Sequence, residues 1–149
     1  RADEMDADAD IIVVFGGTND HGHGDAAFGT FDSRDVHTFY GAMHTLCQKL
    51  INKYSDAEIV FMTPLHKLGE NPQVNQYGVR NVATLSGYVD AIKEVTKYYA
   101  IPTLDLYSVS RLQPEVEVLK ERYMPDGLHP NDAGAEIVAR RLLGFLKSL

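Results

Sequence analysis

The chain has 149 residues, the length of one domain, of which 44% are hydrophobic and 23% charged. This ordinary globular composition excludes disordered, collagen-like and coiled-coil chains. The net charge of −7 argues against a nucleic-acid partner, and a single cysteine, Cys47, excludes an intrachain disulfide and a cysteine-based zinc site. No apolar run approaches the ~20 residues of a membrane helix. The first ten residues are acidic and we expect no signal peptide in them, which leaves a cytoplasmic and a secreted compartment both open for a soluble protein.

The first expected element is a strand at Ile11–Phe15, a continuous apolar run that ends at Gly16-Gly17. A run without polar interruptions is typical of a strand covered on both faces, as in parallel sheets. A Gly- and His-rich loop follows. Apolar residues at helical spacing over residues 36–51 then predict an amphipathic helix with Ser33 as its N-cap. His44 lies off the apolar stripe of this helix, and we expect it to be solvated.

The rest of the chain continues the alternation of strands and helices. Apolar runs predict strands at residues 59–62 and 101–105, and helical periodicity predicts a helix at 85–99. Residues 65–78 are expected to form a long loop over one end of the sheet, and Pro130-Asn131 starts the last helix. The order βαβαβα predicts a single three-layer α/β/α domain with a parallel sheet over residues 1–149. The core face of the last helix is expected to consist of Ile137, Val138, Leu142 and Phe145.

The predicted sheet has an unpaired edge. Ile11–Phe15 has the composition of an interior strand, yet the chain supplies only two further strands. A long apolar edge with unpaired backbone groups promotes aggregation, and proteins usually cover such an edge. We therefore expect either a strand from another chain or sequence in front of Arg1, and we favour additional sequence, so that the domain is N-terminally incomplete.

Two motifs fall at the carboxyl ends of the expected strands, where open parallel sheets bind ligands. Gly16-Gly17-Thr18-Asn19-Asp20 follows the first strand, and the Asn19 amide can point at an anion. Asp126-Gly127-Leu128-His129 precedes the last helix. Its carboxylate can accept from one imidazole nitrogen while the other faces a substrate, as in acyl-transfer enzymes. Alone, the first motif is more often an Asx-turn and the second helix-entry chemistry, but together they favour a functional site.

These motifs resemble two sequence blocks of the SGNH hydrolases, also called the GDSL lipase/esterase family. Gly17-Thr18-Asn19-Asp20 matches the family's third block, Gly-x-Asn-Asp. Asp126-Gly127-Leu128-His129 matches the fifth block, Asp-x-x-His. The resemblance implies a flavodoxin-like fold with five parallel strands in the order 2-1-3-4-5, of which this chain matches the last three. The expected first strand would then be an interior strand of the family sheet.

The resemblance implies a serine ester hydrolase that needs no cofactor. His129 would be the general base, Asp126 its orienting partner and Asn19 an oxyanion-hole donor. We expect a small-molecule ester substrate with a short acyl or acetyl group, acetylated carbohydrates among them, because no long apolar groove is evident. The further residues expected to line the substrate pocket are Gly17, Asp20 and Leu128.

The chain departs from the family in its first two blocks. These blocks carry the nucleophilic serine of Gly-Asp-Ser and a second oxyanion donor, and neither is present in the ten residues before the first strand. We therefore expect the chain alone to be inactive and the intact protein to be an esterase. None of the six serines stands in a Gly-Asp-Ser context: Ser33, Ser55, Ser86, Ser108, Ser110 and Ser148.

Two other interpretations compete with the hydrolase. A non-catalytic SGNH-like binding or interaction module would be stable and monodisperse alone, whereas the hydrolase fragment should self-associate, or pair with an N-terminal fragment, at Ile11–Phe15. A metal site at His21 and His23 is the other interpretation, since two histidines at i, i+2 with flanking carboxylates bind zinc or copper. Glycines on both sides leave no rigid geometry there, so we favour a mobile lid or rim and expect no metal.

Overall fold

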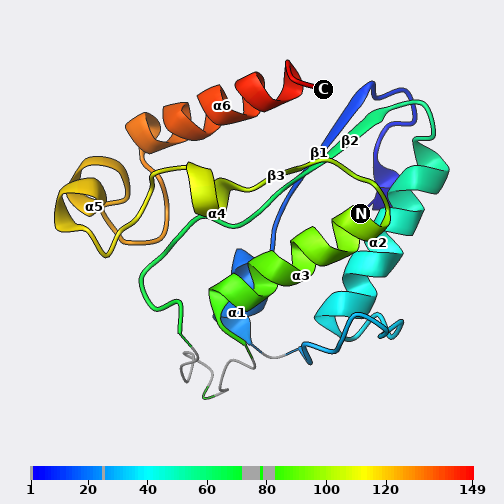
Figure 1. Ribbon diagram of the computed structural model, residues 1–149, viewed down its shortest axis with the longest axis horizontal. Coiled ribbons are helices and arrows are strands. Elements are labelled where there is room, and N and C mark those ends of the chain that lie inside the picture. The colour runs from blue at the N-terminus through cyan, green and yellow to red at the C-terminus, as the bar shows by residue number, and fades with distance from the viewer. Residues whose placement is uncertain (1, 25, 72–77, 79–82) are drawn as a thin grey trace.

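A parallel β-sheet carries helices on both of its faces (Figure 1). Helices α2 (Phe39–Lys53) and α3 (Leu85–Tyr98) cover one face, and α6 (Asp132–Leu146) lies over the other. The arrangement confirms the predicted α/β/α architecture. The computed structural model describes residues 2–24, 26–71, 78 and 83–149.

The sheet consists of β1 (Ile11–Phe15), β2 (Glu58–Met62) and β3 (Thr103–Leu104), parallel and in that order. The third strand is shorter than the predicted 101–105. It ends early because the Asp105 side chain accepts a hydrogen bond from the Ser108 backbone N–H and so caps the next helix. The three predicted strands are otherwise confirmed.

The face under α2 and α3 holds the larger core. Ile12 of β1 and Phe61 of β2 point to this face because side chains alternate along a strand. They meet Tyr88, Ile92 and Val95 of α3, which recur at helical spacing and are at most 2% exposed. The predicted helix at 85–99 is thereby confirmed.

The start of α2 differs from the prediction. Its N-cap is Thr38, whose hydroxyl accepts from the Gly41 backbone N–H at 3.1 Å. The predicted cap, Ser33, instead accepts from the Thr30 N–H at 2.9 Å within a turn. Thr38 has an extended backbone conformation, so the helix begins only at Phe39.

His44 of α2 is buried, and the expectation that it is solvated is wrong. Its side chain is 1% exposed, with Nδ1 at 3.1 Å from the Tyr99 hydroxyl and Nε2 at 2.9 Å from the Phe31 carbonyl oxygen. The segment that precedes α2 folds back over the helix. It therefore covers a side that the apolar periodicity marked as exposed.

The opposite face is formed by the C-terminal half of the chain. The short helices α4 (Leu106–Val109) and α5 (Glu117–Tyr123) lead into α6. The buried members of this second core are Met62, Leu65, Leu104, Leu106, Leu112 and Met124. The predicted core face of α6 is confirmed, since partly buried Ile137, Val138, Leu142 and Phe145 pack against this cluster.

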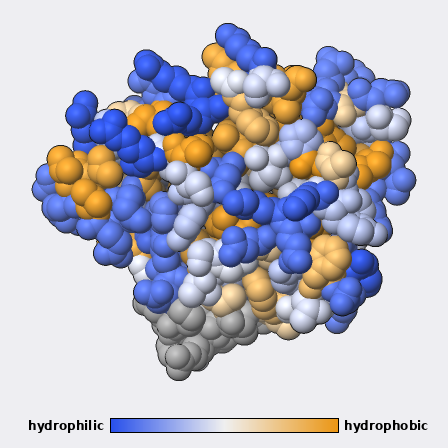
Figure 2. All heavy atoms as spheres, viewed as in Figure 1, coloured by the Kyte–Doolittle hydropathy of each residue, from blue (hydrophilic) through white to orange (hydrophobic). Residues whose placement is uncertain are grey.

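The outer edge of β1 has no neighbouring strand among the residues that the structure describes. A short 3-10 helix, η1 (Ala2–Glu4), precedes β1 and lies against α2. Ile11, Val13 and Phe15 are 50%, 41% and 50% exposed, because α6 extends over β2 and β3 rather than over β1. Apolar side chains also reach the surface over α5 and among the polar side chains of α6 (Figure 2). No helix in the described part of the chain is long and apolar enough to cross a membrane.

Candidate active site

The loop that enters α6 holds Asp126 and His129 together. His129 Nδ1 lies 2.7 Å from Asp126 Oδ2, while Asp126 Oδ1 accepts from the backbone N–H groups of Leu128 at 2.8 Å and His129 at 2.7 Å. Gly127, at φ 75°, makes the turn that brings the two side chains to the same side. The contact occupies Nδ1 and leaves Nε2 as the nitrogen that can take a proton from a reacting group.

The Asp126 carboxylate is ionised at neutral pH. The hydrogen bond from the His129 side chain, followed by the two backbone N–H groups, lowers the pKa of Asp126 to about 2. Both side chains remain open to solvent, at 76% for His129 and 54% for Asp126. The pair therefore has the arrangement of a base and its orienting carboxylate on an accessible surface.

The turn after β1 presents Asn19. Gly17 has φ 101°, and the chain then enters α1 (Thr18–His23) rather than the predicted loop. The helix forms because this turn lets the His21 N–H reach the Gly17 carbonyl oxygen at 3.1 Å. Asn19 is exposed in the first turn, and its side chain makes no hydrogen bond to any described residue. This leaves its amide available to a ligand and does not fit the Asx-turn interpretation.

A cavity of about 280 Å³ brings the two motifs together at the carboxyl end of the sheet. Three of the predicted site residues line this cavity: Asn19, Leu128 and His129. Asp126 is not part of the wall but contacts His129, which is. The described residues of its wall are Phe15, Thr18, Asn19, Leu65, Lys67, Leu128, His129 and Pro130.

Gly17 and Asp20 lie next to this cavity rather than in its wall. They line an adjoining hollow of about 240 Å³ that shares Phe15, Thr18 and Asn19 with it. Gly17 also permits a close approach, because a Cβ there would lie 3.2 Å from Pro64 Cγ. Its conformation and its contact with the segment after β2 are therefore both specific to glycine.

The loop after β2 supplies the side chain that sequence analysis missed, Lys67. No helix or strand is present in the described residues 65–71, and residues 72–77 of the expected loop lie outside the described residues. Lys67 is half-buried and lines the cavity beside Asn19 and Leu128. Its position in the sequence could have indicated this role, because Lys67 follows the end of a predicted strand and lies in a loop expected to cross one end of the sheet.

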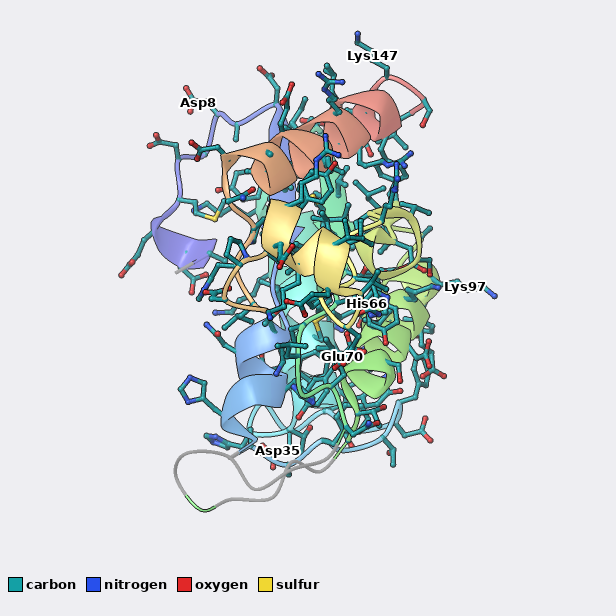
Figure 3. The ribbon with its side chains drawn as sticks, turned by 90° about the vertical axis from the view of Figure 1, so that its left-hand side faces the viewer. Asp8, Asp35, His66, Glu70, Lys97 and Lys147 are labelled. Carbon is teal, nitrogen blue, oxygen red and sulfur yellow. The ribbon has the colours of Figure 1, made fainter. Side chains whose placement is uncertain are left out.

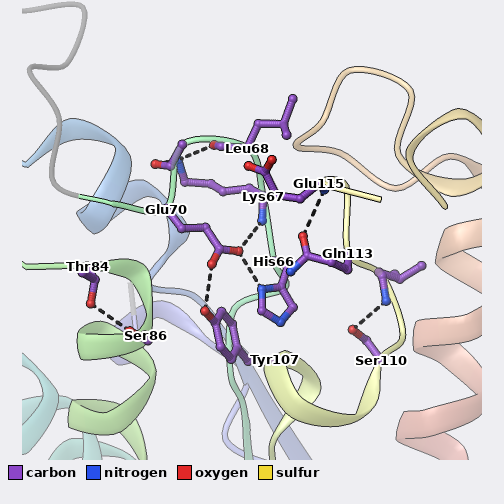
Figure 4. Close-up of polar contacts among 12 residues, drawn as sticks. His66, Lys67, Leu68, Glu70, Thr84, Ser86, Tyr107, Ser110, Gln113 and Glu115 are labelled. Carbon is purple, nitrogen blue, oxygen red and sulfur yellow. Dashed lines mark hydrogen bonds and ion pairs between the residues drawn. The ribbon is translucent and has the colours of Figure 1, made fainter. Parts of the chain in front are cut away.

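His66, in the same loop, has a structural role. Its Nδ1 lies 2.7 Å from Glu70 Oε1, and its ring packs against the Tyr107 ring, tilted by 33° with the centroids 3.7 Å apart. Glu70 also accepts from the Tyr107 hydroxyl at 2.8 Å (Figure 4). Figure 3 shows His66 and Glu70 close together near the centre of the face in view. This network shapes the loop that carries Lys67.

Neither serine near the functional end of the sheet lies in the cavity wall. Ser108 Oγ donates to Asp105 Oδ2 at 2.9 Å, and Ser110 is buried and accepts from the Leu112 backbone N–H at 3.2 Å. Both hydroxyls are thus used in local structure. Within the described wall of the cavity, no serine faces His129.

The His21 and His23 segment has no metal-binding cluster among the described residues. His21 is fully buried, and its Nε2 contacts the Glu70 carbonyl oxygen at 3.1 Å. Asp25, one of the flanking carboxylates, lies outside the described residues. The expected lid is in part the helix α1, which ends at His23.

Solved structures resemble the whole chain. One crystal structure is 36% identical to this chain, with a TM-score of 0.86. The match covers 99% of this chain and 68% of the chain in that structure. A protein from Lactobacillus plantarum is 33% identical over 98% of this chain and 70% of its own, with a TM-score of 0.85. A possible lipase from Chitinophaga pinensis shares the fold at 24% identity, with 94% and 73% coverage and a TM-score of 0.68.

No curated protein matches the sequence. The sequence profile of the GDSL-like lipase/acylhydrolase family matches residues 1–137, a span that includes both motifs of the candidate site. Together with the parallel sheet and the Asp126–His129 pair at its carboxyl end, this match identifies the chain as a member of the GDSL-like lipase/acylhydrolase family of hydrolases.

Proposed function

We propose that this chain contributes the general base and an oxyanion donor to a serine ester hydrolase that acts on short acyl esters. The observation that carries the proposal is the 2.7 Å contact between Asp126 and His129 at the rim of a cavity that also contains Asn19. The family match supports the same reaction class. The nucleophilic serine comes from a segment other than these 149 residues.

The proposed reaction assigns one role to each side chain. His129 Nε2 takes the proton of the serine hydroxyl as its oxygen attacks the ester carbonyl, and ionised Asp126 stabilises the imidazolium. The Asn19 amide donates to the oxyanion, a contact worth about 3 kcal/mol of barrier in comparable sites. His129 then protonates the leaving alcohol, and it later takes a proton from the water that releases the acid.

The outer edge of β1 is the proposed place for the strand that carries the serine. A parallel strand paired there would bring its carboxyl end to the same edge of the sheet as Gly16 and Asn19. Its presence would also cover Ile11, Val13 and Phe15. The two solved structures that are 36% and 33% identical support this view, because the chain spans 68% and 70% of their length.

The size of the cavity favours short acyl groups. A volume of about 280 Å³ is small for a ligand site. A Geobacillus acetyl-xylooligosaccharide esterase shares the fold at 20% identity, with a TM-score of 0.54 over 91% of this chain and 58% of its own. We accordingly propose acetyl esters, with acetylated carbohydrates as the preferred class.

Hydrolysis of 4-nitrophenyl acetate tests the proposal on the 149-residue chain and on the protein expressed from its complete coding region. We expect no turnover by the chain alone. We expect turnover by the complete protein, and a loss of roughly 10²- to 10⁴-fold in kcat for His129→Ala. The control is His37→Ala, an exposed histidine outside the cavity, which should leave kcat within about twofold. An active protein whose rate does not respond to His129→Ala would contradict the proposed base.

A non-catalytic binding module is the second candidate. It is favoured by one observation, that no serine is among the described residues of the cavity wall. This candidate predicts a monodisperse chain by size-exclusion chromatography and a complete protein without esterase activity. The hydrolase predicts association through β1, which an N-terminal fragment would suppress.

A further inference from the structure

Lys67 lies on a wall shared by two hollows of the candidate site. It lines the 280 Å³ cavity with Asn19 and His129. It also lines a hollow of about 160 Å³ that extends toward Gly22 and His23 of α1. A molecule that places its ester beside His129 therefore has the Lys67 side chain as a neighbour.

The Lys67 ammonium has weak partners. Its Nζ lies 3.4 Å from the Leu68 carbonyl oxygen and 3.5 Å from the Gly69 carbonyl oxygen, both long for hydrogen bonds (Figure 4). Among the residues that the structure describes, no carboxylate forms an ion pair with it. Burial lowers the pKa of Lys67, because the charged form has lost water.

The nearest acid in the loop, Glu70, is engaged elsewhere. Its carboxylate accepts from the Tyr107 hydroxyl, contacts His66 Nδ1 and accepts from the backbone N–H of Lys67 at 2.9 Å. The carboxylate thus points toward Tyr107 and His66 (Figure 4). Glu70 thus holds the loop together through these contacts, and the Lys67 ammonium can still bind an anion.

We infer that Lys67 binds a carboxylate of the substrate, so that the site selects esters that carry a negative charge beside the scissile bond. The inference rests on the proposed function, since it assigns a specificity to the same cavity. A substrate carboxylate would supply the ion-pair partner that Lys67 does not have among the described residues, through charge-assisted hydrogen bonds stronger than those to neutral hydroxyls. The chain's net charge of −7 repels anions at long range, so such selection depends on a local cation.

Equilibrium binding to the 149-residue chain, followed by backbone amide NMR shifts, tests the inference without turnover. Monomethyl succinate carries its charge on the acyl side of the ester, and acetoxyacetate carries it on the alcohol side. Dimethyl succinate and methyl acetoxyacetate are the neutral counterparts. We expect one anionic probe to bind about tenfold more tightly than its neutral counterpart, as a charge-assisted contact would give. The pair that shows the difference identifies the side of the ester that faces Lys67.

Three variants assign the preference to this side chain. Lys67→Met should abolish the preference, and Lys67→Arg should retain most of it. Lys97→Met makes the same change in net charge at an exposed position of α3 and should leave the preference unchanged. Three outcomes would each overturn the inference. The charged and neutral probes could bind equally well, neither anion could show saturable binding, or the preference could survive in Lys67→Met.

The outcome is distinguishable from failure of the proposed reaction. Binding of the anionic probe requires Lys67 but neither the serine nor proton transfer by His129. His129→Ala should therefore keep the preference for the charged probe while it removes turnover in the complete protein. If the complete protein without any substitution showed the preference but no esterase activity, the result would support the role of Lys67 and contradict the hydrolase.

Discussion

The two faces of the sheet are covered to different extents. On the α2 and α3 face, Leu50, Tyr88 and Val95 are at most 2% exposed. On the α6 face, the only buried residue that the helix itself contributes is Gly134, and Leu143 is 54% exposed. The chain therefore builds one well-packed core and one that α6 covers only in part.

Strand β1 explains the difference. Its alternate side chains divide between the faces, so that Ile12 is 4% exposed under α2 and α3 while Val13 is 41% exposed on the other side. The loop with Asp126 and His129 leads directly into α6. The candidate site is thus attached to the less covered face, and its geometry depends on a helix with few buried contacts.

A matched pair of leucine truncations gives the largest expected contrast between the faces. Leu50→Ala in α2 removes a side chain that is 2% exposed, and we expect it to cost about 2–5 kcal/mol of unfolding free energy. Leu142→Ala in α6 removes a partly buried side chain and should cost about 1 kcal/mol. Urea unfolding of both variants measures the difference. Equal costs would show that the α6 face is packed as well as the other.

Glycine-to-alanine changes at three positions compare how tightly α2 and α6 are packed. A Cβ at Gly41 of α2 would overlap the Asp35 backbone, and one at Gly134 of α6 would lie 2.6 Å from the Tyr123 carbonyl oxygen. We expect each Gly→Ala change to cost about 1–3 kcal/mol through overpacking, with the smaller cost at Gly134 because α6 has room to shift.

The control for these variants is Gly144→Ala, also in α6. A Cβ there meets nothing within 4 Å, so the higher helix propensity of alanine should stabilise the chain by up to about 1 kcal/mol. Thermal unfolding monitored by circular dichroism compares all three. A larger loss at Gly134 than at Gly41 would mean that α6 is held more rigidly than its exposure indicates.

The smallest expected effect concerns the pKa of Asp126, an exposed residue in the loop before α6. Carboxyl ¹³C NMR should give a midpoint of about 2, and His129→Ala should raise it because the largest cause of the low pKa is lost. Since the folded value lies below the ordinary 3.8, ionised Asp126 stabilises the fold above that pH, and the contribution disappears as the pH falls through about 2. A midpoint near 3.8 with and without His129 would contradict the hydrogen-bonded pair.

Several predictions that depend on short-range sequence agree with the structure, although the predicted N-cap Ser33 does not. The apolar run of β1 and the helical period of α3 are formed by neighbouring residues, so their patterns were readable before packing was known. The same holds for Asp126 and His129, because a contact between residues three apart across a glycine turn is local. The missed α1 had no apolar period to mark it, since its residues are small and polar.

The sequence by itself determined the strands, the main helices and the two motifs of the family. Only the tertiary structure decided which side chains share the cavity, that His44 is buried, and that Lys67 stands beside Asn19 and His129. The physical reason is distance along the chain. Lys67 lines the same cavity as residues about 50 and 60 positions away, and His44 is covered by a segment that periodicity within its own helix does not detect.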